Sequence, residues 1–437
     1  MIDLRKLERK LLSVEKPARY VGSELNSVVK DRDIDIRFAF AFPDTYEVGM
    51  SHTGLHILYH LMNSMENVWC ERVFAPWTDM EEVMRQNNIP LYGLESKDEL
   101  TAFDFVGFTL QYEMSYTNVL NMLNLGGIPI KSKDRDNDMP IVIAGGPCVY
   151  NPEPLHEIID LFTVGETEEL LPVLLNLYNE EKKNGFNKIK FLEKAAALDG
   201  IYVPQFYEEV YNEDGTIKER KLLNENAKEI VKKTIIKDLD KSFYPEKSIL
   251  PYIDVVHDRV VLELFRGCTR GCRFCQAGMV YRPVREKEAN TLVKQAETLI
   301  KSTGHDEISL TSLSSGDYSC LPDLTLQLLD MYENQNISLS LPSLRLDSMN
   351  FEIIERLQEV RKSGLTFAPE AGTQRLRDVI NKGLTEEDIL KGAMDAFVSG
   401  WNRVKLYFML GLPSETLEDV EGIAVLSDKI AREYYTI

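Results

Sequence analysis

Short apolar segments alternate with amphipathic helical segments along most of the chain, and this alternation limits the possible folds. The first run has helical segments near 51–65, 79–87, 114–125 and 167–182. Its apolar segments are RFAFAF (37–42), VWCERVFA (68–75), DFVGFTL (104–110), PIVIAGG (140–146) and LFTVGE (161–166). Near-continuous apolar strands separated by helices are typical of a parallel sheet covered on both faces. We therefore expect residues 35–182 to form a doubly wound α/β domain, with any ligand at the carboxyl ends of its strands.

A second run of the same kind occupies residues 257–437. Its apolar segments are VVLELFR (260–266), EISLTSL (307–313), ISLSLPS (337–343), LTFAPE (365–370) and RVKLYFML (403–410). Between the two runs, residues 183–256 are expected to be a linker with a β-hairpin around Asp214-Gly215, because Asp-Gly is a strong hairpin signal. Residues 1–34 are expected to form a helix and an irregular arm. No internal repeat of the length used by repeat proteins is present.

Composition excludes several classes of protein. Hydrophobic residues make up 44% of the 437 residues, which is typical of a globular chain. Lys and Arg number 50 against 70 Asp and Glu, a net charge of −20, which argues against unassisted binding to nucleic acid or an anionic membrane. The start, MIDLRKLERKLL, lacks the apolar region of a signal peptide, and no segment is apolar for long enough to cross a membrane. We expect a cytoplasmic protein.

Three of the six cysteines lie close together in LFRGCTRGCRFCQAG, directly after an apolar strand. Cys268, Cys272 and Cys275 have the spacing C-x3-C-x2-C, which suits three corners of an iron-sulfur cube and leaves one iron open. One alternative is a zinc loop, although structural zinc usually takes four ligands, and His257 and His305 lie outside the loop. The other is a set of buried, unreactive thiols. The sequence favours the cluster.

This segment resembles the radical S-adenosylmethionine (SAM) superfamily, whose signature is C-x3-C-x-aromatic-C after the first barrel strand; Phe274 supplies the aromatic residue. The resemblance implies a 4Fe-4S cluster on the three cysteines and a partial (β/α) barrel. It also implies that SAM binds the open iron and is cleaved reductively to methionine and a 5′-deoxyadenosyl radical. The cofactors carry this chemistry, and the protein orients them.

The resemblance also implies SAM-binding residues at the ends of the following strands. Ser315, Gly316 and Asp317 occupy the place of a Gly-Gly-Glu-like motif that holds the amino group of SAM. After the later strands the implied residues are Ser343, Arg345, Glu370 and Gly411, with Arg375 and Lys382 beyond Glu370. Ser414 or Glu415 has a simpler explanation as the start of a helix. For each polar residue taken alone, a cap or a surface salt bridge explains the sequence as well as a ligand does.

The first domain resembles the flavodoxin-like, cobalamin-binding type found ahead of such barrels in one subclass of the superfamily. These domains often carry D-x-H-x-x-G after the first strand, where the His binds cobalt. Here Asp44 and Gly49 match the first and last residues of this motif, but Tyr46 occupies the position of the His, and a phenol is a poor cobalt ligand. Thr109, Gly145 and Gly146 are further residues that the resemblance assigns to cobalamin. We expect cobalamin without a protein ligand, or a domain that only caps the barrel mouth.

Three histidines and two cysteines of the first domain have simpler explanations than metal binding. His52, His56 and His60 are spaced along one helix face and could replace the missing ligand, but a half-exposed helix face explains them equally well. Cys70 and Cys148 are expected to be small core or loop residues.

These features predict an enzyme of the radical SAM type. With cobalamin, it would transfer a methyl group; SLSSGDYS and PEAGTQRLR also resemble methylthiotransferases that act on RNA or ribosomal protein, so RNA or protein modification is one expected substrate class. The expected protein partner is a one-electron donor such as flavodoxin or ferredoxin. The alternatives are a radical SAM enzyme without cobalamin, and a redox or cobalamin-sensing module without catalysis. Substrate contacts come from loops that follow no general pattern.

The length itself leads to one further expectation. The resembling barrels have six strand-helix units, whereas five strands are found here, the last being 403–410. We therefore expect a partial barrel of five strands in a short or truncated chain.

Overall fold

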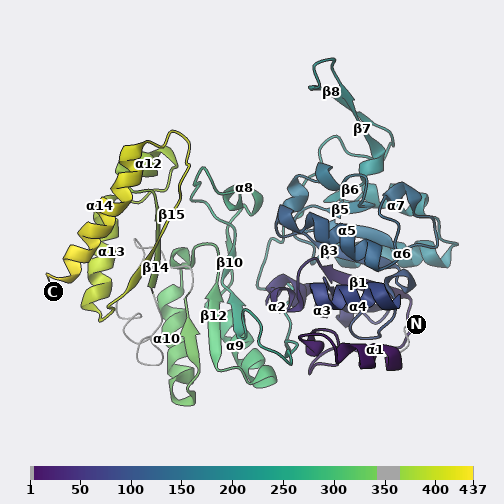
Figure 1. Cartoon of the computed structure of the whole chain (residues 1–437), viewed down its shortest axis with the longest axis horizontal. Coiled ribbons are helices and arrows are strands. Elements are labelled where there is room, and N and C mark those ends of the chain that lie inside the picture. Colours follow the sequence, from purple (N-terminus) through teal and green to yellow (C-terminus); the bar gives the residue numbers. More distant parts are fainter. Residues whose placement is uncertain (1–3, 342–364, 437) are drawn as a thin grey trace. The chain divides into compact units, whose positions relative to one another are not determined.

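The chain divides into two units, each with its own parallel strands (Figure 1). The computed structural model describes residues 4–341 and 365–436. The first unit comprises Met1–Ile236 and Ser242–Asp258, and the second comprises Lys237–Lys241 and Arg259–Ile437. Most of the expected linker, 183–256, therefore belongs to the first unit.

A six-stranded sheet with the order β2-β1-β3-β4-β5-β6 forms the centre of the first unit. Its strands are β1 (Ile36–Phe42), β2 (Val68–Phe74), β3 (Phe105–Thr109), β4 (Ile141–Gly145), β5 (Leu161–Thr163) and β6 (Ile201–Tyr202). The first five are parallel, and β6 pairs antiparallel with β5. This order is that of the flavodoxin-like doubly wound sheet, so the fold class expected for the first domain is confirmed.

Burial explains why these segments become central strands. All seven residues of β1, IRFAFAF, are buried, as expected of a parallel strand covered on both faces. The helices of the unit are α1 (Leu4–Leu11), α2 (Tyr46–Gly49), α3 (Thr53–Ser64), α4 (Thr78–Asn87), α5 (Tyr116–Leu125), α6 (Leu170–Lys183) and α7 (Lys188–Ala196). Helix α7 and strand β6 both lie in the stretch that was expected to be a linker.

The N-terminal arm covers β2, the edge strand of this sheet. The indole Nε1 of Trp69 donates a hydrogen bond to the carbonyl oxygen of Val28 at 3.0 Å, and Lys30 Nζ donates to the carbonyl oxygen of Val68 at 2.6 Å. Arg72, wholly buried on β2, forms ion pairs with Glu24 of the arm at 2.6 Å and with Glu95 at 2.8 Å. The arm thereby protects an edge that could otherwise pair with another chain.

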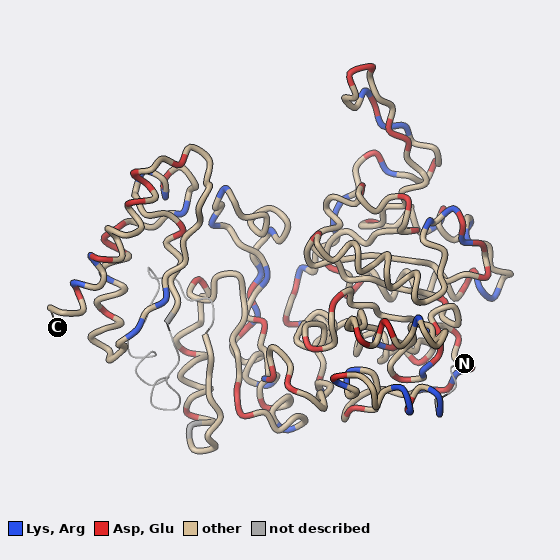
Figure 2. The backbone as a smooth tube through the Cα atoms, viewed as in Figure 1, with Lys and Arg blue, Asp and Glu red and all other residues tan. Residues whose placement is uncertain are grey.

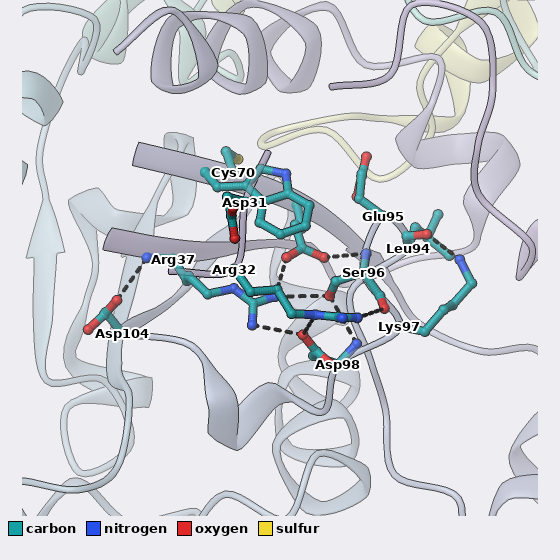
Figure 3. A network of polar contacts seen from close by, with 12 residues as sticks. Asp31, Arg32, Arg37, Cys70, Leu94, Glu95, Ser96, Lys97, Asp98 and Asp104 are labelled. Atoms are coloured by element: carbon teal, nitrogen blue, oxygen red, sulfur yellow. Dashed lines mark hydrogen bonds and ion pairs between the residues drawn. The ribbon is translucent and has the colours of Figure 1, made fainter. Parts of the chain in front are cut away.

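A second network of charged side chains surrounds Arg37 at the start of β1 (Figure 3). Its guanidinium pairs with Asp98 at 2.9 Å and with Glu71, and its backbone N–H donates to Asp104 at 2.8 Å. Arg32 of the arm binds the same Asp98 carboxylate at 2.9 Å. The buried charges are therefore paired, as burial in a protein interior requires.

The hairpin expected around Asp214-Gly215 is present and projects away from the sheet (Figure 1). Strands β7 (Tyr207–Tyr211) and β8 (Ile217–Leu222) pair antiparallel, and Gly215 has the left-handed φ of +81° that such a turn needs. Every residue of β8 is exposed, and Figure 2 shows basic and acidic residues interspersed along the hairpin.

The second unit contains two parallel sheets in its described part, with the order β13-β12-β9 in one and β14-β15 in the other. Its strands are β9 (Val260–Glu263), β10 (Phe265–Arg266), β11 (Arg285–Glu286), β12 (Glu307–Thr311), β13 (Ser338–Ser340), β14 (Leu365–Glu370) and β15 (Val404–Phe408). The five predicted segments all contain a parallel strand, but 260–266 is divided into β9 and β10, and β10 pairs antiparallel with β11. Within the described ranges the strands form a partial barrel that is not closed.

In the described residues of this unit, the helices are α8 (Ala277–Val280), α9 (Ala289–Thr303), α10 (Leu321–Tyr332), α12 (Gln374–Val379), α13 (Glu386–Val398) and α14 (Leu417–Tyr434). Thr385 with Asp388, and Thr416 with Asp419, form capping boxes at the starts of α13 and α14. The apolar faces of α13 and α14 form a core with Phe367 and Trp401.

Candidate functional site

The cysteine loop, residues 267–276, connects β10 to α8. Gly267 opens it with a φ of +103°. A Cβ atom at this position would lie 2.5 Å from the carbonyl oxygen of Pro283 and 2.7 Å from that of Tyr281. Because backbone atoms cannot move aside as a flexible side chain can, only glycine fits at the start of the loop.

The segment that follows α12 anchors this loop. The backbone N–H of Arg273 donates to the carbonyl oxygen of Ile380 at 2.9 Å, and Asn381 Nδ2 donates to the carbonyl oxygen of Gly271 at 2.8 Å. The guanidinium of Arg273 also donates to the carbonyl oxygen of Val379. These hydrogen bonds hold the loop at Gly271 and Arg273, on either side of Cys272. None of them involves a cysteine thiol.

All three thiols of the loop are free: Cys268 and Cys272 are half-buried and Cys275 is exposed. Across residues 4–341 and 365–436, no group of three His, Cys, Asp or Glu side chains is close enough to hold a single metal ion. A 4Fe-4S cluster takes its ligands at separate corners of a cube, so it accepts thiolates that stand further apart. The donor set, three thiols on one anchored loop, fits such a cluster.

A cavity of about 480 Å³ adjoins the loop. Its walls are formed by β10, the cysteine loop, the residue before β11 and the segment after β12, through the residues Phe265, Cys268, Thr269, Arg270, Val284, Ser314 and Asp317. This volume lies in the range of cofactor and small-molecule sites. Cys268 and one pair of opposite charges, Arg270 and Asp317, therefore line the same cavity.

Of the three residues implied after β12, the structure places Asp317 at this cavity. Arg270 Nε donates to Asp317 Oδ2 at 2.8 Å, and a second guanidinium nitrogen contacts the other carboxylate oxygen. Ser315, in contrast, is fully buried, and its hydroxyl lies 3.0 Å from that of Ser312. Ser315 and Gly316 therefore shape the turn that presents the Asp317 carboxylate.

Lys382 contacts both Glu370 and Phe274. Lys382 Nζ donates to Glu370 Oε1 at 3.1 Å and lies 5.9 Å from the centre of the Phe274 ring. Glu370 ends β14 with a φ of +66°, which is uncommon for a residue other than glycine. Such strained positions are frequent at functional sites, where the surrounding structure holds them.

Gly411 and Arg375, also implied by the resemblance, do not line this cavity. Gly411 has a φ of +82°, and its N–H donates to Glu415 Oε2 at 2.7 Å. Arg375 donates to the carbonyl oxygen of Ser414 at 3.0 Å and pairs with Asp419, so its charge is used at the start of α14. Ser343 and Arg345 lie outside the described residues.

In the first unit, three of the residues assigned to cobalamin meet where β3 and β4 end. Thr109 pairs in register with Gly145, and Gly146 follows with a φ of +102°. A Cβ atom would lie 2.7 Å from Thr163 Oγ1 at Gly145, and 2.6 Å from the carbonyl oxygen of Leu110 at Gly146. Packing within the unit thus accounts for both glycines. A small cavity of about 50 Å³ is lined here by Thr109 and both glycines, with mainly apolar neighbours.

Asp44, Tyr46 and Gly49 follow β1 but face different surroundings. Asp44 accepts a hydrogen bond from the Tyr112 hydroxyl at 3.0 Å. Tyr46 is buried, and its hydroxyl donates to Glu24 at 2.8 Å inside the Arg72 network. A Cβ atom at Gly49 would lie 2.3 Å from the Phe74 ring. Contact between Tyr46 and a bound ligand would require this network to open.

The three histidines do not form one half-exposed helix face. His52 precedes α3 as its N-cap, where its Nδ1 accepts the N–H of Leu55 at 3.1 Å. His56 is buried, with its Nε2 2.8 Å from the carbonyl oxygen of Met50. Burial lowers the pKa of His52 to about 4, and burial with the nearby charges of His56 and Arg72 lowers that of His60 to about 3.

Because the pKa values of His52 and His60 are lowered in the folded unit, we expect the first unit to lose stability in mild acid. In the unfolded chain both would take up protons near pH 6.5, whereas the folded unit resists protonation of His52 until about pH 4 and of His60 until about pH 3. Their contribution is therefore complete above pH 6.5 and is lost as the pH falls. His60→Gln is expected to reduce the slope of unfolding free energy between pH 6 and 4.5 by up to about 1.4 kcal/mol per pH unit. Urea unfolding at several pH values measures this slope, and His156→Gln, at an exposed site, is the control.

Five residues that line the cavity were not predicted from the sequence: Phe265, Thr269, Arg270, Val284 and Ser314. Arg270 lies between the cysteines, and Ser314 precedes the Gly-Gly-Glu-like segment. Arg270 is 47 residues from Asp317 in the sequence, so no local pattern could reveal their contact. Cys70 and Cys148 are buried, as expected for core residues.

Comparison with known protein families and relatives gives matches over both units. Residues 54–204 match the family described as radical SAM proteins, N-terminal, and residues 262–426 match the radical SAM superfamily. The uncharacterized protein MJ0966 of Methanocaldococcus jannaschii is 30% identical over 90% of this chain and 74% of its own length. The uncharacterized methyltransferase PH0819 of Pyrococcus horikoshii is 24% identical over 68% of this chain. The ribosomal protein uS12 methylthiotransferase RimO of Leptospira biflexa is 27% identical over 36%.

Two solved structures share the fold. The cobalamin-dependent SAM radical enzyme OxsB has a TM-score of 0.57 at 13% identity, covering 96% of this chain and 57% of OxsB. The radical SAM methyltransferase TsrM from Kitasatospora setae has a TM-score of 0.58 at 12% identity, covering 90% and 73%. The chain spans 60% of PH0819 and 36% of RimO. In the described ranges, no helix is both long and apolar enough to cross a membrane.

Proposed function

This chain belongs to the radical SAM superfamily, and from that premise we propose that Cys268, Cys272 and Cys275 hold a 4Fe-4S cluster beside a SAM site. The observation that carries the proposal is the position of the cysteine loop. Its three free thiols stand on one anchored loop, and a cavity of about 480 Å³ opens against Cys268. When bound, the reduced cluster supplies one electron that cleaves SAM to methionine and a 5′-deoxyadenosyl radical, the chemistry of this superfamily.

The residues of this chain are suited to orient the cosubstrate. The Asp317 carboxylate lines the cavity and can accept hydrogen bonds from the amino group of SAM. Glu370, fixed by Lys382 at 3.1 Å, presents carboxylate oxygens that suit ribose hydroxyls. At Gly411, no described residue other than its chain neighbours lies within 4 Å of an added Cβ atom, which leaves room beside its backbone for an adenine ring. Ser343 and Arg345 complete the proposed set.

The direct test is anaerobic reconstitution with iron and sulfide, followed by reduction with dithionite in the presence of SAM. The expected products are 5′-deoxyadenosine and methionine in equal amounts, measured by liquid chromatography and mass spectrometry. If fully reconstituted protein forms neither, it is not a catalyst of this kind, and a redox or sensing module becomes the better description.

We further propose that cobalamin binds at the carboxyl ends of the first unit's strands, without a cobalt ligand from Tyr46. Thr109, Gly145 and Gly146 meet at this edge, and Asp44 lies on the loop after β1. The phenol of Tyr46 is engaged with Glu24, and burial raises its pKa far above the ordinary range, so it cannot act as a phenolate ligand. OxsB and TsrM, whose folds this chain shares, are both described with cobalamin bound.

Gel filtration after incubation with hydroxocobalamin tests this part. Retention of the corrin absorbance with the protein is expected. If the corrin is lost, a radical SAM enzyme without cobalamin remains, in which the first unit has another role.

For the reaction itself we propose transfer of a methyl or methylthio group to RNA or protein, supported by the similarity to a methyltransferase and to RimO. A cytoplasmic flavodoxin or ferredoxin would donate the electron. Anaerobic assays on RNA and ribosomal protein fractions with methyl-labelled SAM would identify the acceptor.

A further inference from the structure

We infer that Arg270 binds the carboxylate of the SAM amino-acid group while Asp317 binds its amino group, so that the cosubstrate replaces the ion pair between these two residues. The inference rests on the proposed function and assigns a specificity role to a residue inside the cysteine motif. Both side chains line the same cavity as Cys268.

The geometry of the pair suits a ligand that carries both charges. Arg270 Nε donates to Asp317 Oδ2 at 2.8 Å, and its terminal nitrogen contacts Oδ1, so the guanidinium and the carboxylate face each other as two forks. The same fork that fits Asp317 fits another carboxylate. An α-amino acid presents an ammonium and a carboxylate on one carbon, and therefore offers each partner a replacement of opposite charge.

Exchange of this pair is energetically feasible because the pair is not buried. The side chains of Arg270 and Asp317 are 36% and 29% exposed. Partly exposed ion pairs contribute little net stability, typically about 0–1 kcal/mol. The wholly buried pair of Arg72 and Glu24 in the first unit shows the contrasting case, in which removal of either partner is costly.

The cysteine loop has other anchors than this pair. Arg273 and Asn381 already fix it through backbone carbonyls of Ile380 and Gly271. Arg270 therefore can turn from Asp317 to a ligand without releasing the loop.

Binding of two ligands to the anaerobically reconstituted protein tests the inference. Equilibrium dialysis compares SAM with decarboxylated SAM, which keeps the amino group and lacks the carboxylate. Arg270→Met is expected to weaken SAM binding about ten- to a hundredfold, the range of a charge-assisted hydrogen bond, and to leave the affinity for decarboxylated SAM unchanged or higher. Asp317→Asn is expected to weaken both ligands. Arg270→Lys should restore part of the SAM affinity.

Each outcome has one meaning. If Arg270→Met weakens both ligands equally, Arg270 only positions Asp317 and the inference is overturned; equal SAM affinity in wild type and variant also overturns it. In both cases the proposed function stands, whereas a wild type that binds no SAM with its cluster intact contradicts the proposed function instead.

Matched measurements show that the variants are otherwise intact. Iron content and the electron paramagnetic resonance spectrum of the reduced cluster should be unchanged in Arg270→Met. Arg259→Met is the matched control. It removes the arginine of a similar pair, Arg259 with Glu307, at the amino ends of β9 and β12, whereas the cavity adjoins the segment after the carboxyl end of β12. This variant should bind both ligands as wild type does.

Discussion

Cys272→Ala is expected to lose the iron-sulfur cluster and with it all formation of 5′-deoxyadenosine above the protein-free background. Cys272 is the central cysteine of a loop that supplies every proposed protein ligand, so its removal leaves two thiolates for a cluster that needs three. Iron and sulfide analysis, the visible absorption band and product analysis after reconstitution measure the loss.

Cys320→Ala is the matched control, because Cys320 is a free, half-buried cysteine of the same unit outside the loop. It should retain the cluster and the activity. Circular dichroism of both variants distinguishes cluster loss from unfolding. A Cys272→Ala protein that keeps a complete cluster would show that the cysteine loop is not its site.

Arg72→Met is expected to destabilise the first unit by about 3–5 kcal/mol, because it leaves the carboxylates of Glu24 and Glu95 buried without their partner. Tyr46 and Tyr59 surround the same group: Tyr46 donates to Glu24, and the Arg72 guanidinium lies 5.8 Å from the Tyr59 ring. Urea unfolding followed by tryptophan fluorescence measures the change. In a Trp401→Phe background the remaining tryptophans, Trp69 and Trp77, both report on the first unit.

The control is Lys183→Met, which breaks an exposed pair with Asp35 in the same unit and should cost less than about 1 kcal/mol. Adding Glu24→Gln and Glu95→Gln to Arg72→Met removes the unpaired charges and should recover part of the lost stability. A loss below about 1 kcal/mol in Arg72→Met would mean that the unit relaxes and admits water to the two carboxylates.

Strands were predicted well where their residues are buried on both faces. The segment predicted at 37–42 lies within β1, and that at 104–110 contains β3, because parallel central strands require continuous apolar residues. Helix α7 was missed because its charged residues resemble a linker, although its buried Phe191 and Leu192 pack on the core. Strand β6 has only two residues, and a pairing that short leaves no periodic pattern.

The candidate site was likewise predictable from the sequence only in part. The three cysteines are identifiable because their function requires a fixed local spacing, which the sequence displays directly. The contact of Asp317 with Arg270, 47 residues away in the sequence, depends on how distant segments pack. The buried position of Tyr46 likewise depends on Glu24, 22 residues earlier.

The arm that covers β2 also constrains how the protein can be made. Residues 24–32 leave the ribosome before strand β2, and the acid groups that pair with Arg72 lie on both sides of it in the sequence, at Glu24 and Glu95. Glu24 and Arg72 are 48 residues apart, so this contact cannot form until the segment of β2 has been synthesised. In a nascent chain, Glu24 must remain hydrated through this interval, and the sheet edge is closed only when the arm folds back.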